Sequence, residues 1–247
     1  MKKRRILKII LAVFAAFILI GVLALFIWSR TGTYPARSTS IAALASTNTV
    51  TVTQDDWIAF TPLANPQTGL IFYPGGLVEP TAYAPVLHRI AQGGVLVVIA
   101  PMPLNLAILN IGVADDIISA FPSIDSWILA GHSLGGASAA IFAENNPESI
   151  DAMVFWDSYP PNSANLSDNG LPILSIFGTT NGTPNTEGFD ERKYLLPENT
   201  EFIAIEGANH AQFGDYGPQK DDVLASITLD EQHEIVTAIM LDFILQD

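Results

Sequence analysis

Short apolar segments with strand-like composition alternate with segments of helical periodicity over most of this 247-residue chain. The alternation is typical of a single α/β domain, in which helices cover both faces of a mainly parallel sheet. From Gly69 onward the strand segments are almost entirely apolar, as strands buried on both faces must be. Eight strands are expected, at Thr49–Thr53, Trp57–Phe60, Gly69–Tyr73, Val95–Ala100, Trp127–Ala130, Ala152–Trp156, Ile173–Phe177 and Glu201–Ile205. Four helices are expected, near Thr81–Gln92, Asn105–Ala120, Ser133–Asn145 and Leu229–Leu245.

The first thirty residues differ from the rest in charge and hydropathy. MKKRRILK carries five basic residues, and Ile9–Trp28 continues for 20 residues without a charge. A helix of that length spans about 30 Å, the thickness of a bilayer core. We therefore expect residues 1–8 to be a cytoplasmic basic segment, and residues 9–28 to be a single-pass signal anchor in the lipid bilayer of the cell membrane. The remainder should lie outside the cytoplasm.

A cleaved signal peptide is the alternative, and would make the protein secreted. The apolar run is longer than such peptides usually contain, and no small-x-small cleavage site closely follows Trp28. Residues 29–48 are rich in Ser, Thr, Ala and Pro, so we expect them to form a tether. Residues 49–247 then form the folded domain.

Charge and residue usage exclude several classes of function. After the first thirty residues the chain has 5 basic and 25 acidic residues, and such a surface does not favour nucleic acid. The absence of cysteine excludes thiol catalysis and thiolate metal sites. The four histidines are widely scattered, so neither a metal nor a cofactor is expected. Nothing in the sequence indicates an oligomeric state.

The segment WILAGHSLGG, from Trp127 to Gly136, has the pattern of a nucleophile elbow. In G-x-S-x-G the serine lies on a tight turn between a strand and a helix, and Gly131 and Gly135 leave room for that turn. Ser133 is therefore the candidate nucleophile. The backbone N–H of Leu134, at the start of the following helix, is a candidate donor to an oxyanion.

A second oxyanion donor is expected in the loop after an earlier strand. GLIFYPGGLVEP ends an apolar strand in Pro74-Gly75-Gly76, so Gly76 is the candidate, with Leu77 as its neighbour. A turn without function is the alternative for this loop. The substrate pocket is expected to include side chains that follow strand ends, namely Leu77, Met102, Leu104 and Asn105.

His210 is the candidate base. It follows the last expected strand, which ends at Ile205, in a glycine-rich loop from which an imidazole can reach the serine. His132 is the variable residue of the elbow and is expected to point away from the nucleophile. His88 and His233 fall on expected helices.

Five phrases of the chain resemble one family of enzymes. FYPGG, APMPLNLAIL, GHSLGGA, LPILSIFGT and GANHAQFGDYG resemble the α/β-hydrolase superfamily, in its compact cap-less branch similar to dienelactone hydrolases. The resemblance covers Trp57 to the C-terminus. It implies the α/β-hydrolase fold without a cap domain and a serine-acid-histidine order along the chain, but it names no substrate.

The acid of this constellation departs from the family's pattern. Many such hydrolases have a phrase like G-x-x-D-G after a later strand, whereas this chain has GTTNG, with Asn181 in place of the carboxylate. Asp157 directly follows the strand beside the nucleophile strand, and resembles the acid position of haloalkane dehalogenases. Glu187 or Asp190 could instead supply the acid from the loop beyond Asn181. A third possibility is a weakened triad.

These observations predict a membrane-anchored, extracytoplasmic serine hydrolase. Its expected triad is Ser133, Asp157 and His210, and its expected substrates are small acyl or aryl esters, cleaved through an acyl-enzyme. Two alternatives remain open at this point. One is a weak or inactive binding protein with the hydrolase fold, and the other is an acyltransferase with the same triad.

Overall fold

The computed structural model describes residues 2–180, 191–220 and 222–245, and divides into two compact units, Met1–Thr33 and Tyr34–Asp247. The first unit is helix α1 (Lys2–Gly32). Its segment Arg4–Gly32 is long and apolar enough to cross a membrane, with a mean hydropathy of 3.2 over its most apolar window.

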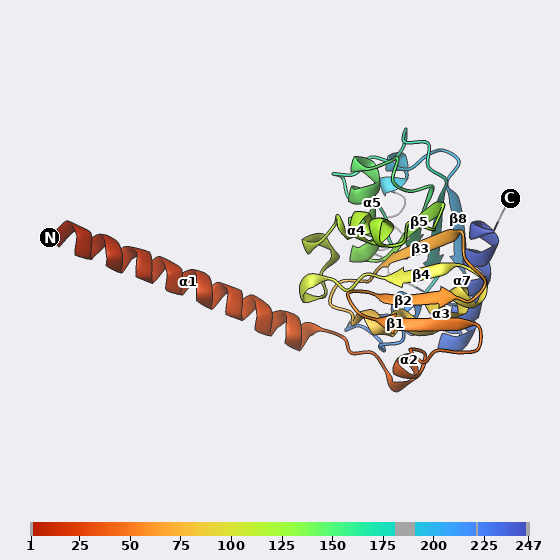
Figure 1. Ribbon diagram of the computed structural model, residues 1–247, viewed down its shortest axis with the longest axis horizontal. Helices are drawn as coiled ribbons and strands as arrows, with labels where there is room; N and C mark the ends of the chain where they lie inside the picture. The colour runs from red at the N-terminus through yellow and green to blue at the C-terminus, as the bar shows by residue number, and fades with distance from the viewer. Residues whose placement is uncertain (1, 181–190, 221, 246–247) are drawn as a thin grey trace. The chain divides into compact units, whose positions relative to one another are not determined.

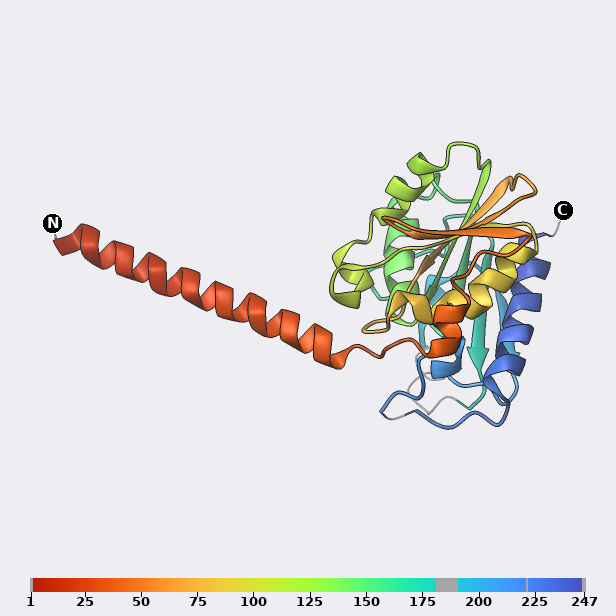
Figure 2. The ribbon, with the colours of Figure 1, turned by 60° about the horizontal axis from the view of Figure 1, so that its bottom comes forward.

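The second unit is built on an eight-stranded sheet with the order β1-β2-β4-β3-β5-β6-β7-β8 (Figures 1 and 2). The strands are β1 (Val50–Gln54), β2 (Ile58–Pro62), β3 (Thr68–Tyr73), β4 (Leu96–Ile99), β5 (Ser126–His132), β6 (Ala152–Trp156), β7 (Ile173–Gly178) and β8 (Glu201–Ile205). All eight fall where the sequence predicts a strand. Their boundaries differ by a few residues.

The sheet is parallel except at one edge. β2 pairs antiparallel with both β1 and β4, with Val50 opposite Pro62 and Ile58 opposite Ile99. The six strands from β4 to β8 in the sheet order run parallel to one another. Their carboxyl ends therefore meet at one edge of the sheet, where ligands bind in folds of this kind. The prediction of a mainly parallel sheet is confirmed.

Helices cover both faces of the sheet (Figures 1 and 2). α3 (Ala84–Gln92) and α7 (Leu229–Ile244) share one buried apolar cluster with one face. α4 (Val113–Ala120) and α5 (Leu134–Asn145) contribute to a second cluster on the other face. The alanines of α5 are almost all buried, and their small side chains let the helix lie close to the strands.

One expected helix is much shorter than predicted. Asn105–Ala120 was expected to be helical, but regular α-helix begins only at Val113. Leu104 and Asn105 have φ values of 56° and 54°, which do not propagate a right-handed helix. The preceding residues form two short 3₁₀ helices, η2 (Pro103–Asn105) and η3 (Ala107–Leu109).

Residues 29–48 also differ from the expected tether. Residues up to Gly32 continue α1, and the second unit begins at Tyr34. Tyr34 N–H donates to Leu77 O at 2.7 Å, and Tyr34 O accepts from Glu79 N–H at 3.0 Å. The following helix α2 (Ser38–Ala42) buries Ser40, whose hydroxyl donates to the carboxylate of Asp215 at 3.0 Å. Hydrogen bonds of Tyr34 and Ser40 thus hold the residues from Tyr34 onward as part of the folded domain.

Candidate active site

Ser133 lies on a strained turn between β5 and α5. Its φ and ψ are 51° and −122°, a conformation that is costly for a residue other than glycine. The flanking glycines leave no space for a side chain. A Cβ on Gly135 would lie 2.0 Å from Tyr73 O, and one on Gly131 would lie 2.5 Å from Gly135 C. The sequence pattern thus corresponds to a turn that close packing of backbone against backbone holds in place.

The structure brings together Asp157 and His210, which lie 53 residues apart in the chain. Asp157 directly follows β6, the neighbour of β5, and has a φ of 45°. Its Oδ2 is hydrogen bonded to His210 Nδ1, and its Oδ1 accepts from Gly178 N–H at 3.4 Å. The carboxylate side chain is 0% exposed and the imidazole 14% exposed. A buried carboxylate needs such partners, because its desolvation is otherwise costly.

Ser133 and this pair open onto the same cavity, which has a volume of about 250 Å³. The other residues that line it are Leu134, Ala137, Ser158 and Tyr159. Ser158, two residues after β6, donates from Oγ to Ser133 O at 2.6 Å and so holds the backbone of the turn. The lining combines a hydroxyl, an imidazole and a carboxylate with small and aromatic side chains. It can therefore accept a small polar group that carries an apolar substituent.

Four side chains expected in the substrate pocket are not among the residues that line this cavity, within the part of the chain that the structure describes. Met102 is 6% exposed and packs in the second core cluster. Leu77 lies on the loop after β3, whereas Leu104 and Asn105 lie on the loop after β4, and all three have φ values near 55°. The two loops are adjacent, because Leu77 N–H donates to Asn105 O at 2.7 Å. The side chains that line the cavity come instead from the residues after β5, β6 and β8.

The loop after β3 presents one backbone N–H between two that are already bonded. Gly75 N–H donates to Tyr83 Oη at 3.0 Å, and Leu77 N–H donates to Asn105 O. A Cβ on Gly76 would lie 2.9 Å from Leu134 Cδ2, so the backbone of Gly76 passes close to the first residue of α5. N–H groups at the start of a helix have no acceptor within it. The N–H groups of Gly76 and Leu134 thus belong to two backbone segments that lie close together, and Leu134 directly follows Ser133.

Three alternatives for the acid, Asn181, Glu187 and Asp190, lie outside the described residues.

Two buried side chains near the site received no role in the sequence analysis. His132 and Tyr83 are both 0% exposed, and Tyr83 Oη lies 2.8 Å from His132 Nδ1. His132 does not line the cavity, but its ring lies 4.4 Å from that of His210. Sequence reasoning missed this pair, because His132 occupies the variable position of the elbow and Tyr83 comes from a loop 49 residues away in the chain.

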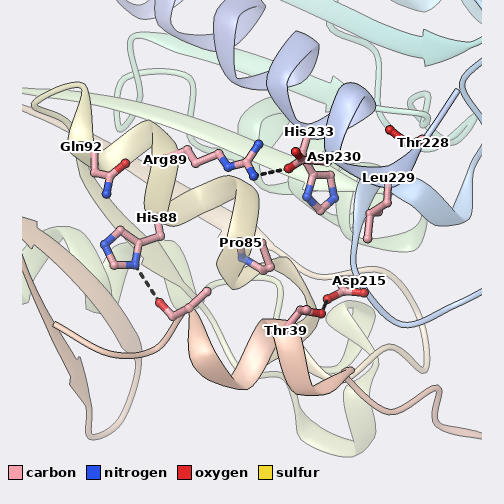
Figure 3. A pocket seen from close by; sticks show the side chains of 11 residues that line it. Thr39, Pro85, His88, Arg89, Gln92, Asp215, Thr228, Leu229, Asp230 and His233 are labelled. Carbon is pink, nitrogen blue, oxygen red and sulfur yellow. Dashed lines mark hydrogen bonds and ion pairs between the residues drawn. The ribbon is translucent and has the colours of Figure 1, made fainter. Parts of the chain in front are cut away.

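The remaining histidines lie at another cavity of about 630 Å³, between α2, α3 and the start of α7 (Figure 3). His88 Nδ1 is hydrogen bonded to Ala43 O at 2.7 Å, and Arg89 pairs with Asp230. Burial, and after it the nearby Arg89, lower the pKa of His233 to about 4. Among the described residues, no group of three or more His, Asp or Glu side chains is arranged to hold a metal ion.

Comparison with known proteins agrees with this architecture. Residues 69–234 match the alpha/beta hydrolase family, and the chain belongs to that family. No curated protein sequence matches the chain.

Solved structures with low sequence identity share the fold. The hyperthermophilic esterase from Pyrobaculum calidifontis has a TM-score of 0.59 and 14% identity, over 84% of this chain and 91% of its own. The esterase domain of a Rhodothermus marinus protein has a TM-score of 0.57 and 15% identity, over 76% of this chain and 90% of its own. Est1E from Butyrivibrio proteoclasticus has a TM-score of 0.55 and 16% identity, over 81% of this chain and all (100%) of its own. The family supports a general hydrolase role, and these structures show that the fold is shared.

Proposed function

We propose that this protein is a serine hydrolase, and specifically a carboxylesterase for small acyl or aryl esters. The observation that carries the proposal is the shared cavity of Ser133, on its strained turn, and the hydrogen-bonded pair of Asp157 and His210. A nucleophile, a base and a group that orients the base are the minimum set for acyl transfer.

Each group has a role that follows from its position. Ser133 Oγ attacks the ester carbonyl, and His210 Nε2 accepts the serine proton and returns it to the leaving alcohol. Asp157 accepts from His210 Nδ1–H, which leaves Nε2 as the basic nitrogen and stabilises the imidazolium that forms. Water then attacks the acyl-enzyme in a second step of the same kind.

The N–H groups of Leu134 and Gly76 are the donors that we assign to the oxyanion. Both belong to backbone that packing fixes in advance, so the donors need no rearrangement when the carbonyl oxygen becomes charged. The bond of Leu77 N–H to Asn105 O supports Gly76 rather than Leu77 as the second donor. The small volume of the cavity, about 250 Å³, favours esters with a short acyl or a single aryl group.

We place the hydrolase domain outside the cytoplasm, anchored by α1 as a single-pass helix with its basic residues in the cytoplasm. The length and hydropathy of Arg4–Gly32 support the anchor, and the basic residues before the apolar run support the orientation. If the segment is cleaved, the same domain is secreted. Protease accessibility of the domain in intact cells, compared with broken cells, tests this placement.

Labelling with a fluorophosphonate probe tests the nucleophile. The full chain in detergent should label, and Ser133→Ala should not, because the probe reacts with an activated serine. The matched control is Ser138→Ala. Ser138 lies in α5, the helix that follows Ser133, and its buried hydroxyl donates to Leu134 O at 2.8 Å. Absence of label on the parent chain would exclude the enzyme and leave a binding protein with the hydrolase fold. Product analysis with an added alcohol separates hydrolysis from acyl transfer.

A further inference from the structure

Two fully buried side chains connect the loop after β3 to the loop of His210. Tyr83, at the end of the 3₁₀ helix η1 (Pro80–Tyr83), and His132, at the end of β5, are both 0% exposed. Gly75 N–H donates to Tyr83 Oη at 3.0 Å, and Tyr83 Oη lies 2.8 Å from His132 Nδ1. A Cβ on Gly75 would lie 2.8 Å from both of these side-chain atoms. The loop backbone therefore rests directly on this pair.

The hydrogen bonds favour one arrangement of the protons. Tyr83 Oη accepts from Gly75 N–H, and its single proton can be donated to His132 Nδ1. In this arrangement the neutral His132 ring carries its proton on Nε2, a buried atom with no hydrogen-bond partner among the described residues. Burial raises the pKa of Tyr83 well above its usual value. Burial, together with the neighbouring His210, lowers the pKa of His132 well below its usual value.

His132 is in ring contact with the candidate base. The ring centroids of His132 and His210 lie 4.4 Å apart at an interplanar angle of 40°. Phe213 stacks on His132 as well, at 5.7 Å and 22°. The ring of His132 thus packs against the rings of both His210 and Phe213.

The titratable groups that face His132 are few. Among the described residues they are Tyr83 from η1 and His210 from the loop after β8, which is itself bonded to Asp157. Tyr216 lies behind Tyr83, at a ring separation of 6.4 Å. A positive charge on His132 would therefore act directly on His210, which must itself become positively charged during acyl transfer.

We propose that His132 is a positioning residue, and that the chain Gly75–Tyr83–His132 couples the oxyanion loop to the base. His132 supports His210 from one side as a neutral ring protonated on Nε2, and Tyr83 selects that form by its donation to Nδ1. The same tyrosine orients Gly75, and so presents the N–H of the adjacent Gly76 toward the site. The inference rests on the proposed roles of Ser133 and His210.

The kinetic test is Tyr83→Phe in the full chain, with p-nitrophenyl butyrate as the probe. The substitution removes the hydrogen bonds of the Tyr83 hydroxyl with Gly75 N–H and with His132 Nδ1. We therefore expect kcat to fall roughly 10-fold or more, with a smaller change in KM. The rate is expressed per site that reacts to completion with the fluorophosphonate probe, so that unfolded chains do not lower it. Tyr83 does not line the cavity, so a fall in kcat with little change in KM indicates a displaced base.

Tyr73→Phe is the matched control. Tyr73 is also 0% exposed, and its Oη donates to Ile111 O and accepts from Ala114 N–H, but it makes no bond to His132. It should leave kcat and KM nearly unchanged. An unchanged kcat in Tyr83→Phe, or an equal fall in Tyr73→Phe, would overturn the proposal.

A spectroscopic test does not depend on turnover. ¹⁵N-histidine NMR spectra of the parent, assigned by the loss of one signal in His132→Gln, should show a neutral ring protonated on Nε2 from about pH 5 to 8. In Tyr83→Phe the same ring should stay neutral, because it remains buried, and should gain a population protonated on Nδ1, because the donor to Nδ1 is lost. An Nδ1-protonated ring, or ordinary titration in the parent, would overturn the inference. If the parent shows this ring but hydrolyses no ester, the failure lies with the proposed function.

Discussion

Replacement of Asp157 by asparagine removes one charge from the candidate triad and little else. The carboxylate side chain is 0% exposed, and asparagine has nearly the same shape. The amide can still accept from His210 Nδ1–H, but it carries no charge to offset the imidazolium. Two opposite charges about 4 Å apart at an effective dielectric constant of about 20 attract by about 4 kcal/mol. That loss corresponds to a fall in kcat on the order of 10³-fold.

The assay is steady-state hydrolysis of p-nitrophenyl butyrate, with kcat and KM measured separately. KM should change little, because the charge is needed when the imidazolium forms and not when the ester binds. Asp151→Asn is the matched control. Asp151 directly precedes β6 just as Asp157 directly follows it, and its Oδ2 accepts from Trp127 N–H at 2.8 Å. It should retain activity within about twofold, since an amide oxygen can accept the same bond.

A small loss of activity in Asp157→Asn would refute the assignment of Asp157 as the acid of the triad. If Asp157→Asn keeps activity within about tenfold of the parent, its charge does not stabilise the imidazolium, and the acid lies elsewhere. Glu187→Gln and Asp190→Asn would then be the variants to test, and a large loss in either would move the acid to the loop beyond Asn181.

Two further predictions concern stability. Gly135→Ala places a Cβ 2.0 Å from a backbone oxygen, and should lower the free energy of unfolding in urea by about 3 kcal/mol or more. Gly112→Ala, where a Cβ meets nothing within 4 Å, should have little effect, and equal losses would contradict the role of close packing. The low pKa of His233, about 4, means that the unfolded chain binds a proton below pH ~6.5 while the folded chain does not. The stability of the parent relative to His233→Asn should therefore decrease by about 3 kcal/mol between about pH 6.5 and 4 in urea titrations, and parallel curves would exclude the shift.

The strands and the elbow are determined locally, and the sequence alone was sufficient to place them. Apolar runs such as Ala152–Trp156 can be strands only where both faces are covered, so composition and spacing identify them. Gly131 and Gly135 indicate the turn because no other residue fits the contacts around Ser133. Family membership follows from the same local patterns.

Other features depend on which segments meet in space. Residues after Thr33 have the composition of a tether, but they pack on the domain because Leu77, Glu79 and Asp215 offer partners for their hydrogen bonds. The helix expected from Asn105 begins late because a left-handed backbone at Leu104 and Asn105 is compatible with contacts to the neighbouring loop.

The candidate site shows the same division. The sequence proposed Asp157 as one of several acids, and the order of β5, β6, β7 and β8 in the sheet is what brings it to His210. Gly76 is preferred to Leu77 as the oxyanion donor because Leu77 N–H is bonded to Asn105 O. The role proposed for His132 depends on its hydrogen bond with Tyr83 Oη. Local patterns fix backbone conformation, since they depend on near neighbours in the chain. Hydrogen-bond partners and proton positions were decided only by the tertiary structure, because they depend on atoms that the chain brings together from distant loops.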